Sequence, residues 1–392
     1  MTISSGSQTT AGNEKKPALK RFLRTKKAVW VPATLILLCG AVLLLAWNCK
    51  RFAGLYREYI FPLWLNSFGR LTSLLPFSLG EILLAIFVIL IVITVIGLPL
   101  LLIFGKKRRK QTAGIAAKCW LWVIAFIMTT ETFNCFILYH APTFAEEYGY
   151  TTDRHTDAQL VNLARLLITR GNAAAEQVSR DADGQFVLTA DLNETAKAAL
   201  RGISGDYPQL DGFYPNPKDI HFSYFMSQQY LMGIYFPFTL EANLNTEMYA
   251  LNMPDTVCHE LSHVRGFILE DEANFIAYLA CVRSGSADYV YSGYYSSIKY
   301  VMNKVRDNCG EETAQELDAL IGDKLYIDLT GNSRYWSTVQ EDKDALLPSD
   351  VVNEVSDAAM NTSLKLNGVE DGRQSYGRMV DLLLNYYEAE IG

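Results

Sequence analysis

The sequence predicts an α+β protein that is mostly helical, with three transmembrane helices followed by a large domain outside the membrane. Two features of its hydrophobic pattern predict this class. The first 140 residues contain three apolar runs, each about the length that a helix needs to cross a hydrocarbon core, at 28–47, 79–104 and 119–139. After His140 the apolar residues recur at three-and-four spacing, which predicts amphipathic helices around a core.

The charged residues divide at the same place. Residues 1–140 hold 17 of the 35 Lys and Arg but only 4 of the 42 Asp and Glu, so the rest of the chain is strongly acidic. An acidic domain repels phosphate groups instead of releasing their counterions. The composition therefore argues against nucleic acid as a partner.

The positions of Lys and Arg also predict an orientation. Seven precede the first apolar run, six lie between residues 105 and 118, and four are spread over 48–78. Positive charge marks the cytoplasmic side, so we expect a cytoplasmic basic tail (1–27), a membrane domain (28–140) and an extracytoplasmic domain (141–392). A cleavable signal peptide would also begin with basic residues, but the first apolar run is too long and lacks a small-residue cleavage site.

The local pattern predicts most elements of the extracytoplasmic domain. Residues 222–245 mix aromatic, aliphatic and turn residues and are the best candidate for strands. Apolar residues at helical spacing predict helices at 157–177, 191–201, 254–265, 270–284, 288–307, 311–321, 348–366 and 373–389. The apolar stretch 61–78 is interrupted by Pro and Gly and is expected to lie in the membrane interface.

The strongest chemical signal is the HExxH sequence at 259–263. On a helix, His259 and His263 stack one turn apart on one face, where both imidazoles can reach a single ion. Glu260 stands beside the first histidine, in position to take a proton from a metal-bound water. Catalytic Zn²⁺ binds imidazole nitrogens at about 2.0–2.1 Å and keeps one coordination position open for that water. The motif therefore predicts a metal centre that activates water.

A third ligand is expected from the acidic sequence that follows Gly266. A turn there could fold a second helix back onto the first, and both Glu270 and Glu272 lie at its start. Helix geometry alone does not separate these two candidates. Asn274 could accept a hydrogen bond from a ligand histidine and fix its tautomer. The same acidic run could equally be an ordinary complement to the helix dipole.

The segment CHELSHVRGF-x-x-EDEANFIAYLAC, with the upstream YFPFTLEANLNT and LLPFSLGEILL, resembles the bacterial family catalogued as domain of unknown function 3810. It is also similar to zincins whose third ligand is a glutamate. This resemblance implies Glu270 as the ligand and a zincin-like metallopeptidase domain as the fold. The chain departs from thermolysin-like enzymes in having Asn274 instead of Asp and only six residues between His263 and Glu270.

In zincins a strand just before the HExxH helix pairs with the substrate backbone. The resemblance places this role on Leu240, Glu241, Ala242 and Asn243. A plain core strand is the alternative interpretation of these four residues.

Other residues are candidates for roles near such a site. The donors available for a transition-state oxyanion are His221, Arg265, Tyr278, Tyr294 and Tyr295. Cys258 and Cys281 would approach each other across a helix hairpin, as a disulfide or as buried free thiols. Glu131, in the third apolar run, is either functional or placed near the headgroups or a neighbouring helix.

These observations predict a zinc metallopeptidase anchored in the bacterial cytoplasmic membrane. Zn²⁺ held by His259, His263 and Glu270 would activate water, and Glu260 would act as general base on a peptide or protein substrate outside the membrane. The alternative is a non-catalytic membrane receptor or scaffold with a structural zinc. The intact Glu260 favours the enzyme, because a structural zinc site has no need of a carboxylate there.

Overall fold

The computed structural model describes residues 25–104, 109–151, 155–345, 347–366 and 377–392. Contacts between residues divide the chain into two compact units. Of the described residues, those within Met1–Ala41 and Val88–Thr129 form unit 1, and those within Val42–Phe87 and Thr130–Gly392 form unit 2. Unit 2 therefore combines residues 42–87 and 130–140 with the domain that the sequence placed outside the membrane.

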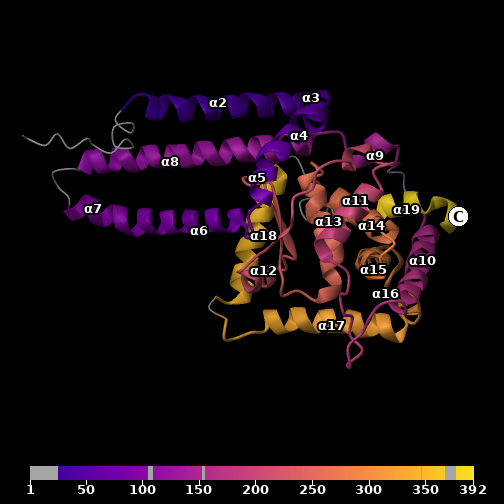
Figure 1. The fold of residues 1–392 in the computed structure, drawn as a ribbon. Coiled ribbons are helices and arrows are strands. Elements are labelled where there is room, and N and C mark those ends of the chain that lie inside the picture. Colours follow the sequence, from indigo (N-terminus) through magenta and orange to yellow (C-terminus); the bar gives the residue numbers. More distant parts are fainter. Residues whose placement is uncertain (1–24, 105–108, 152–154, 346, 367–376) are drawn as a thin grey trace, which may run out of the picture. The chain divides into compact units, whose positions relative to one another are not determined.

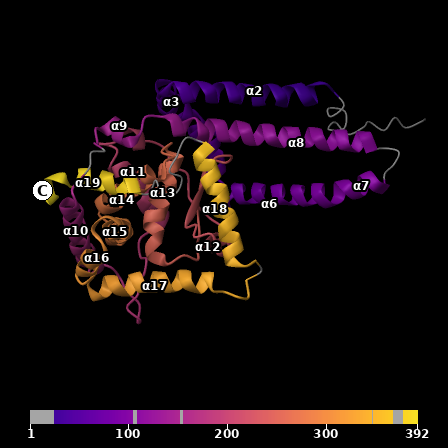
Figure 2. The same cartoon turned by 180° about the vertical axis from the view of Figure 1, so that it is seen from behind.

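Three helices are long and apolar enough to cross a membrane, as the sequence predicts: Lys27–Asn48, Leu79–Leu101 and Arg109–His140. Their elements are α2 (Lys27–Asn48), α6 (Leu79–Val92), η3 (Ile93–Gly97), α7 (Leu98–Phe104), α8 (Arg109–Glu131), η5 (Thr132–Phe136) and η6 (Leu138–His140). Within unit 1 these helices run beside one another (Figures 1 and 2). Cys39 Sγ lies 3.7 Å from Thr129 Oγ1, and Trp120 Nε1 donates to Thr94 Oγ1 at 2.9 Å.

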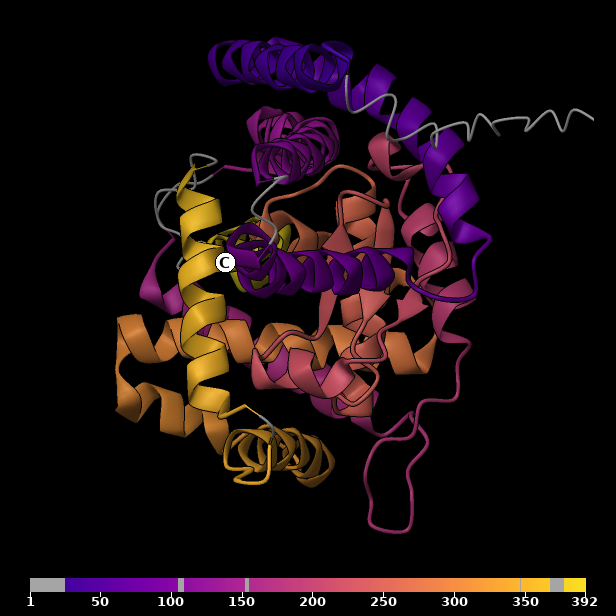
Figure 3. The ribbon, with the colours of Figure 1, turned by 90° about the vertical axis from the view of Figure 1, so that its left-hand side faces the viewer.

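Unit 2 begins with a nearly continuous helical segment between residues 50 and 73 (indigo to violet in Figure 3). Its elements are α3 (Lys50–Leu55), η1 (Tyr56–Ile60), α4 (Phe61–Trp64), η2 (Leu65–Gly69) and α5 (Arg70–Ser73). Pro62 stands in the first turn of α4, where its missing N–H breaks the regular bonding pattern. The π-helical turn before it carries a bond from Phe61 N–H to Tyr56 O, so the path stays helical.

The HExxH sequence lies on α13 (Met253–Val264), which ends in a glycine turn. Gly266 adopts a left-handed conformation (φ +91°) that residues with a Cβ rarely take, and its N–H donates to His263 O at 2.9 Å. The chain then returns as α14 (Glu270–Arg283), packed along α13. The predicted helix hairpin is therefore present.

A small sheet packs on one side of α13. β1 (Lys218–Asp219) pairs parallel with β3 (Glu241–Leu244), and β3 pairs antiparallel with β2 (Gly233–Phe236). The strand order is β1–β3–β2, so β3 is central and β2 lies at an edge of this sheet. All four residues of β3 are buried.

On its other side α13 packs against α11, α14 and α15, which places the HExxH helix in the middle of unit 2 (Figure 1). The further helices of unit 2 are α9 (Phe144–Tyr148), α10 (Asp157–Ala175), α11 (Leu192–Gly202), η7 (Pro208–Leu210), η8 (Ala250–Asn252), α15 (Ala287–Cys309), α16 (Glu311–Asp318), α17 (Asp323–Gln340), α18 (Ser349–Leu366), α19 (Gly377–Tyr386) and α20 (Glu388–Ile391). Buried side chains of α13, α14 and α15 form the centre of the main core. The helices that carry the motif are therefore held by packing on several sides.

Some elements were not predicted, and two of them have a clear physical cause. Residues 223–228 form the helix α12 (Ser223–Gln228) instead of a strand, because Ser223 Oγ bonds to a carbonyl three residues before it and starts a turn. Helix α17 was not among the predicted helices. It is fixed by Asp328, whose buried carboxylate accepts hydrogen bonds from the hydroxyls of Tyr249 and Tyr291. Contacts between residues that are distant in the sequence cannot be predicted from the local hydrophobic pattern.

Candidate metal centre

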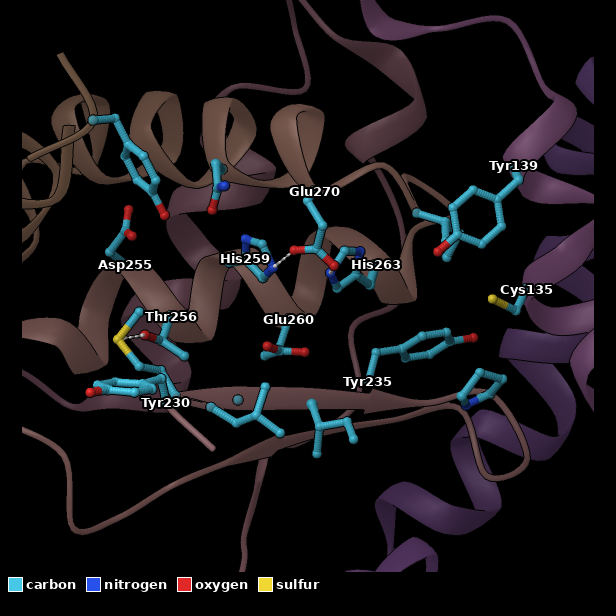
Figure 4. A pocket seen from close by; sticks show the side chains of 18 residues that line it. Cys135, Tyr139, Tyr230, Tyr235, Asp255, Thr256, His259, Glu260, His263 and Glu270 are labelled. Carbon is cyan, nitrogen blue, oxygen red and sulfur yellow. Dashed lines mark hydrogen bonds and ion pairs between the residues drawn. The ribbon is translucent and has the colours of Figure 1, made fainter. Parts of the chain in front are cut away.

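The hairpin of α13 and α14 brings three potential metal ligands together (Figure 4). Nε2 of His259 lies 3.2 Å from Glu270 Oε2, and Nε2 of His263 lies 3.7 Å from Glu270 Oε1. One ligand atom from each residue lies within 4.8 Å of the other two. The arrangement could therefore hold a metal ion between two imidazoles and one carboxylate.

The orientation of His263 is fixed by the main chain. Its Nδ1 lies 2.7 Å from the carbonyl oxygen of Phe267. A carbonyl can only accept a hydrogen bond, so Nδ1 carries the hydrogen and Nε2 keeps its lone pair for a metal. For His263 this carbonyl fills the role that the sequence assigned to Asn274. Asn274 lines the pocket, and its buried Nδ2 has no hydrogen-bond partner within the described residues.

Glu260 extends from α13 toward the edge strand β2 (Figure 4). Its carboxylate lies so close to Gly233 that a Cβ added there would be 2.4 Å from Oε1. Its Oε2 is buried and has no hydrogen-bond partner among the residues that the structure describes. The carboxylate therefore shares the pocket with the three potential ligands and has one oxygen uncommitted.

Burial and neighbouring charges shift the pKa of each of these groups. Burial raises the pKa of Glu260 to about 8, with His259 opposing this shift and Glu270 adding to it. Burial lowers the pKa of His263 to about 4. Burial also disfavours charge on His259, but the hydrogen bond to Glu270 and the nearby carboxylates outweigh it and raise the pKa to about 9. At neutral pH the His259 imidazole is therefore positively charged, with a proton on both ring nitrogens. A metal ion would have to displace one of these two protons.

Glu272, the other candidate for the third ligand, points away from this centre. Its Oε1 accepts a hydrogen bond from Phe144 N–H at 2.5 Å, at the start of α9. Two residues further along a helix corresponds to a rotation of about 200°, so Glu270 and Glu272 face opposite sides of α14. The hairpin therefore presents only Glu270 to the two histidines.

The strand beside the site is β2 and not β3, which corrects the role expected for residues 240–243. β3 has a partner on both sides, so its main-chain groups are used within the sheet. In β2, Met232 O accepts a bond from Asn245 N–H. In an antiparallel pair, the residues of one strand alternately direct their main-chain N–H and C=O groups toward the partner strand and away from it. Because Met232 bonds to the partner strand, the main-chain groups of Gly233 and Tyr235 face the open edge.

The four residues expected to form the substrate strand have other partners. Leu240 and Ala242 are buried apolar residues, and Asn243 Nδ2 donates to Ile234 O at 3.1 Å. The Glu241 carboxylate accepts hydrogen bonds from Leu79 N–H at 3.2 Å and Gly80 N–H at 2.9 Å. Glu241 therefore caps the start of α6, the second apolar helix.

The pocket around the candidate metal centre has a volume of about 310 Å³. The tyrosines that line it, which the sequence analysis did not single out, are Tyr139, Tyr230, Tyr235 and Tyr300. The five predicted oxyanion donors, His221, Arg265, Tyr278, Tyr294 and Tyr295, lie outside its lining. Among 22 tyrosines, only their tertiary positions separate the first group from the second.

The partners of the predicted donors explain their positions. His221 Nδ1 lies 3.3 Å from Glu81 Oε2, and Arg265 Nη2 donates to Gln209 O at 2.6 Å. Tyr278 is buried in the core, and its hydroxyl lies 2.5 Å from the hydroxyl of Tyr387.

The predicted cysteine pair and a neighbour of Glu131 also have places in unit 2. Cys258 and Cys281 are buried free thiols, and burial and the adjacent Cys258 raise the pKa of Cys281 well above its usual range. Asn134, three residues after Glu131, donates through Nδ2 to Pro237 O at 2.7 Å. A polar side chain near the end of the third apolar helix therefore binds the turn between β2 and β3.

Comparison with family models matches residues 56–384 to the family described as protein of unknown function (DUF3810). The match includes both helices of the hairpin, the small sheet, and the second and third apolar helices. Comparisons with curated proteins and with solved structures found no match. Because the matched range covers most of the chain, this protein belongs to the DUF3810 family.

Proposed function

We propose that the protein is a membrane-anchored zinc metallopeptidase. The observation that carries this proposal is the presence of Glu260 in one pocket with His259, His263 and Glu270. A site that only bound a metal for stability would not need an uncommitted carboxylate directed into the same pocket.

The donor set fits zinc. A tetrahedral zinc ion at about 2.0–2.2 Å from each ligand needs ligand atoms roughly 3.3–3.6 Å apart. The separations of 3.2 Å and 3.7 Å between the histidine nitrogens and the Glu270 oxygens are close to this range. Two imidazoles and one carboxylate leave a fourth position for water, as in catalytic zinc sites.

When bound, zinc would supply a water that ionises near neutral pH and a positive charge for the developing oxyanion. Glu260 accepts a proton from the attacking water as the water oxygen bonds to the substrate carbonyl carbon. Glu260 then returns that proton to the amide nitrogen as the C–N bond breaks, which leaves a carboxylic acid and an amine. Burial raises the pKa of Glu260, which moves this carboxyl toward the pH at which it must both take and give a proton.

The edge strand β2 is the part of the sheet that suits substrate binding. The open main-chain groups of Gly233 and Tyr235 could pair with an extended peptide, which gains affinity without depending on its side chains. Gly233 also touches Glu260. A peptide paired along β2 would therefore pass directly beside the general base.

The distribution of Lys and Arg supports a location in the bacterial cytoplasmic membrane with the N-terminus inside. In this orientation the third apolar helix, Arg109–His140, leads outward, and unit 2 acts outside the cytoplasm. The acidic composition after residue 140 argues against a nucleic-acid partner.

The test is the Glu260→Gln variant of the full-length protein in detergent micelles. Gln keeps the size of the side chain but cannot accept the proton, so we expect the zinc content to stay unchanged. Hydrolysis of a peptide mixture should fall by about 10²–10⁴-fold. Glu316→Gln, at an exposed position of α16, is the matched control and should behave like the wild type.

Zinc content is measured by mass spectrometry of the metal, and cleavage by mass spectrometry of the peptides. If the wild type and Glu260→Gln process every mixture alike, the catalytic proposal fails. Stable zinc with no hydrolysis by the wild type would instead favour a receptor or scaffold in which the metal braces α13 and α14.

A further inference from the structure

The pocket of the metal centre ends against the third apolar helix. Cys135 and Tyr139 lie in the last turns of Arg109–His140 and line the pocket. Figure 4 places them beyond Tyr235, at the end of the pocket opposite Asp255. One wall of the candidate active site is therefore made, within unit 2, by the last turns of a helix that is long and apolar enough to cross a membrane.

Two hydrogen bonds join this wall to the edge strand. Tyr235 Oη donates to Asn134 O at 3.0 Å, and Asn134 Nδ2 donates to Pro237 O at 2.7 Å. β2 therefore leads from Gly233, beside Glu260, to the end of the third apolar helix. A peptide that pairs along β2 and places its scissile bond at Glu260 would extend its neighbouring residues toward that helix end.

The helical segment between residues 50 and 73 joins the first apolar helix to the second and exposes many large apolar side chains. Its large exposed side chains and those just after it include Tyr59, Ile60, Leu63, Trp64, Leu71 and Leu74. Exposed Asn66, Ser67 and Arg70 lie among them, so the exposed surface of the segment is amphipathic. Both ends of the segment continue into membrane-length helices, so the partner that fits this face is the boundary between lipid headgroups and acyl chains.

The opposite face of this segment supports the metal-binding hairpin. Tyr56 and Phe61 are buried in one apolar cluster with Ile268, which itself lines the pocket. The Arg57 guanidinium lies 5.0 Å from the ring centroid of Phe267. The turn between α13 and α14 therefore rests directly on a segment whose other face suits lipid. The turn that joins α13 to α14 is therefore separated from the exposed face of this segment by the thickness of one helix, about 10–12 Å.

We propose that the substrates are polypeptides anchored in the same membrane and cut within the first residues that follow their anchor. This inference rests on the peptidase function proposed above and names its substrate class. The pocket wall nearest the third apolar helix is formed by Cys135, Tyr139, Pro237 and Ile268, which suits apolar residues at the membrane boundary. A transmembrane helix and an acyl chain would both present such a segment.

The experiment uses zinc-loaded full-length protein in vesicles of phosphatidylcholine and phosphatidylglycerol. The probes are randomised peptides joined to a host transmembrane helix, or to a palmitoyl chain, through a Gly/Ser spacer of about 2 or about 20 residues. The average end-to-end distance is roughly 25 Å for the longer spacer and roughly 8 Å for the shorter one. Both spacers concentrate the peptide at the membrane surface equally, so their comparison isolates the distance from the anchor.

We expect cleavage behind the short spacer to be at least about tenfold faster than behind the long one, with the cut sites close to the anchor. Faster cleavage with only one of the two anchors supports the proposal and identifies which anchor is used. Equal rates with both spacers overturn it. Tyr139→Asp should slow the short-spacer reaction at unchanged zinc content, whereas Tyr326→Asp, at an exposed position of α17, should not.

Photo-cross-linking separates this inference from the peptidase function. Zinc-loaded Glu260→Gln is irradiated with probes that carry benzoylphenylalanine next to the spacer. We expect the short-spacer probe to label β2 or residues 135–139 and the long-spacer probe to label neither. Cross-linking without hydrolysis by the wild type overturns the peptidase and keeps the membrane-anchored ligand. Hydrolysis without spacer dependence overturns only the inference about the substrate class. If neither cross-linking nor hydrolysis occurs, the peptidase function and the substrate class are both overturned.

Discussion

The carboxylate of Glu260 lies against the α-carbon of Gly233, where an added Cβ would come within 2.4 Å of Oε1 and 2.7 Å of Cδ. Real Cβ contacts essentially never fall below 3.0 Å, so a methyl group at this position requires the carboxylate to move. The edge strand and the Glu260 side chain are therefore matched to each other in shape.

Gly233→Ala is expected to impair catalysis without removing the metal. Displacement of the general base by about 1 Å can cost roughly 100-fold in rate, and we expect a loss of that size in kcat/KM. The three ligands are untouched, so zinc affinity should stay at the wild-type value. Gly202→Ala is the control, because a Cβ there meets no atom within 4 Å. Full activity in Gly233→Ala would contradict the role given to Glu260.

Glu270 and Glu272 can be separated by zinc affinity. Glu270→Gln removes a charged ligand, so we expect zinc binding to weaken by more than about 100-fold in competition with a chromogenic chelator. Glu272→Gln keeps a carbonyl oxygen that can accept the Phe144 N–H and should leave the affinity unchanged. The reverse ranking of the two variants would mean that α14 presents its other face to the metal.

Zinc affinity should depend on pH through His259. Its hydrogen bond to Glu270 overcomes the effect of burial and raises its pKa to about 9, so the imidazole is protonated below that pH and must lose the proton to bind zinc. In the Glu260→Gln variant, which removes the other pocket group that titrates in this range, the apparent affinity should therefore rise by about tenfold per pH unit from neutral pH and level off above about 9. Burial lowers the pKa of His263 to about 4, so it adds no slope in this range.

Chelator competition at several pH values measures this slope. Calorimetry in buffers of different ionisation enthalpy counts the protons released. An affinity that does not change between neutral pH and pH 9 would show that His259 holds no competing proton.

Glu241→Gln should destabilise unit 2 and leave the metal centre intact. The carboxylate accepts hydrogen bonds from the N–H groups of Leu79 and Gly80 at the positive end of α6. Gln keeps one acceptor oxygen but loses the charge, so we expect a loss of about 1–2 kcal/mol in the free energy of unfolding. A lower thermal midpoint in detergent would report it. Glu247→Gln, at an exposed position nearby, is the control, and equal midpoints for both variants would exclude the capping role.

Much of the architecture follows from local pattern. The three apolar helices were predicted because length and hydrophobicity alone decide whether a helix suits a bilayer. The helices that carry the motif were predicted because apolar spacing, Pro254 and Gly266 mark their course and ends. Helix α17 was not predicted, since it depends on hydrogen bonds from Tyr249 and Tyr291 to Asp328, which are distant in the sequence.

By itself, the sequence determined that His259, Glu260 and His263 share one helix and that an acidic helix follows after a glycine turn. Only the tertiary structure decided that Glu270 faces the histidines while Glu272 faces Phe144, because a choice between two helix faces depends on what packs against each. Tertiary structure also placed β2 at the open edge and the end of the third apolar helix in the pocket wall. Periodicity describes one element at a time, whereas a pocket is made by elements that meet only when the chain folds.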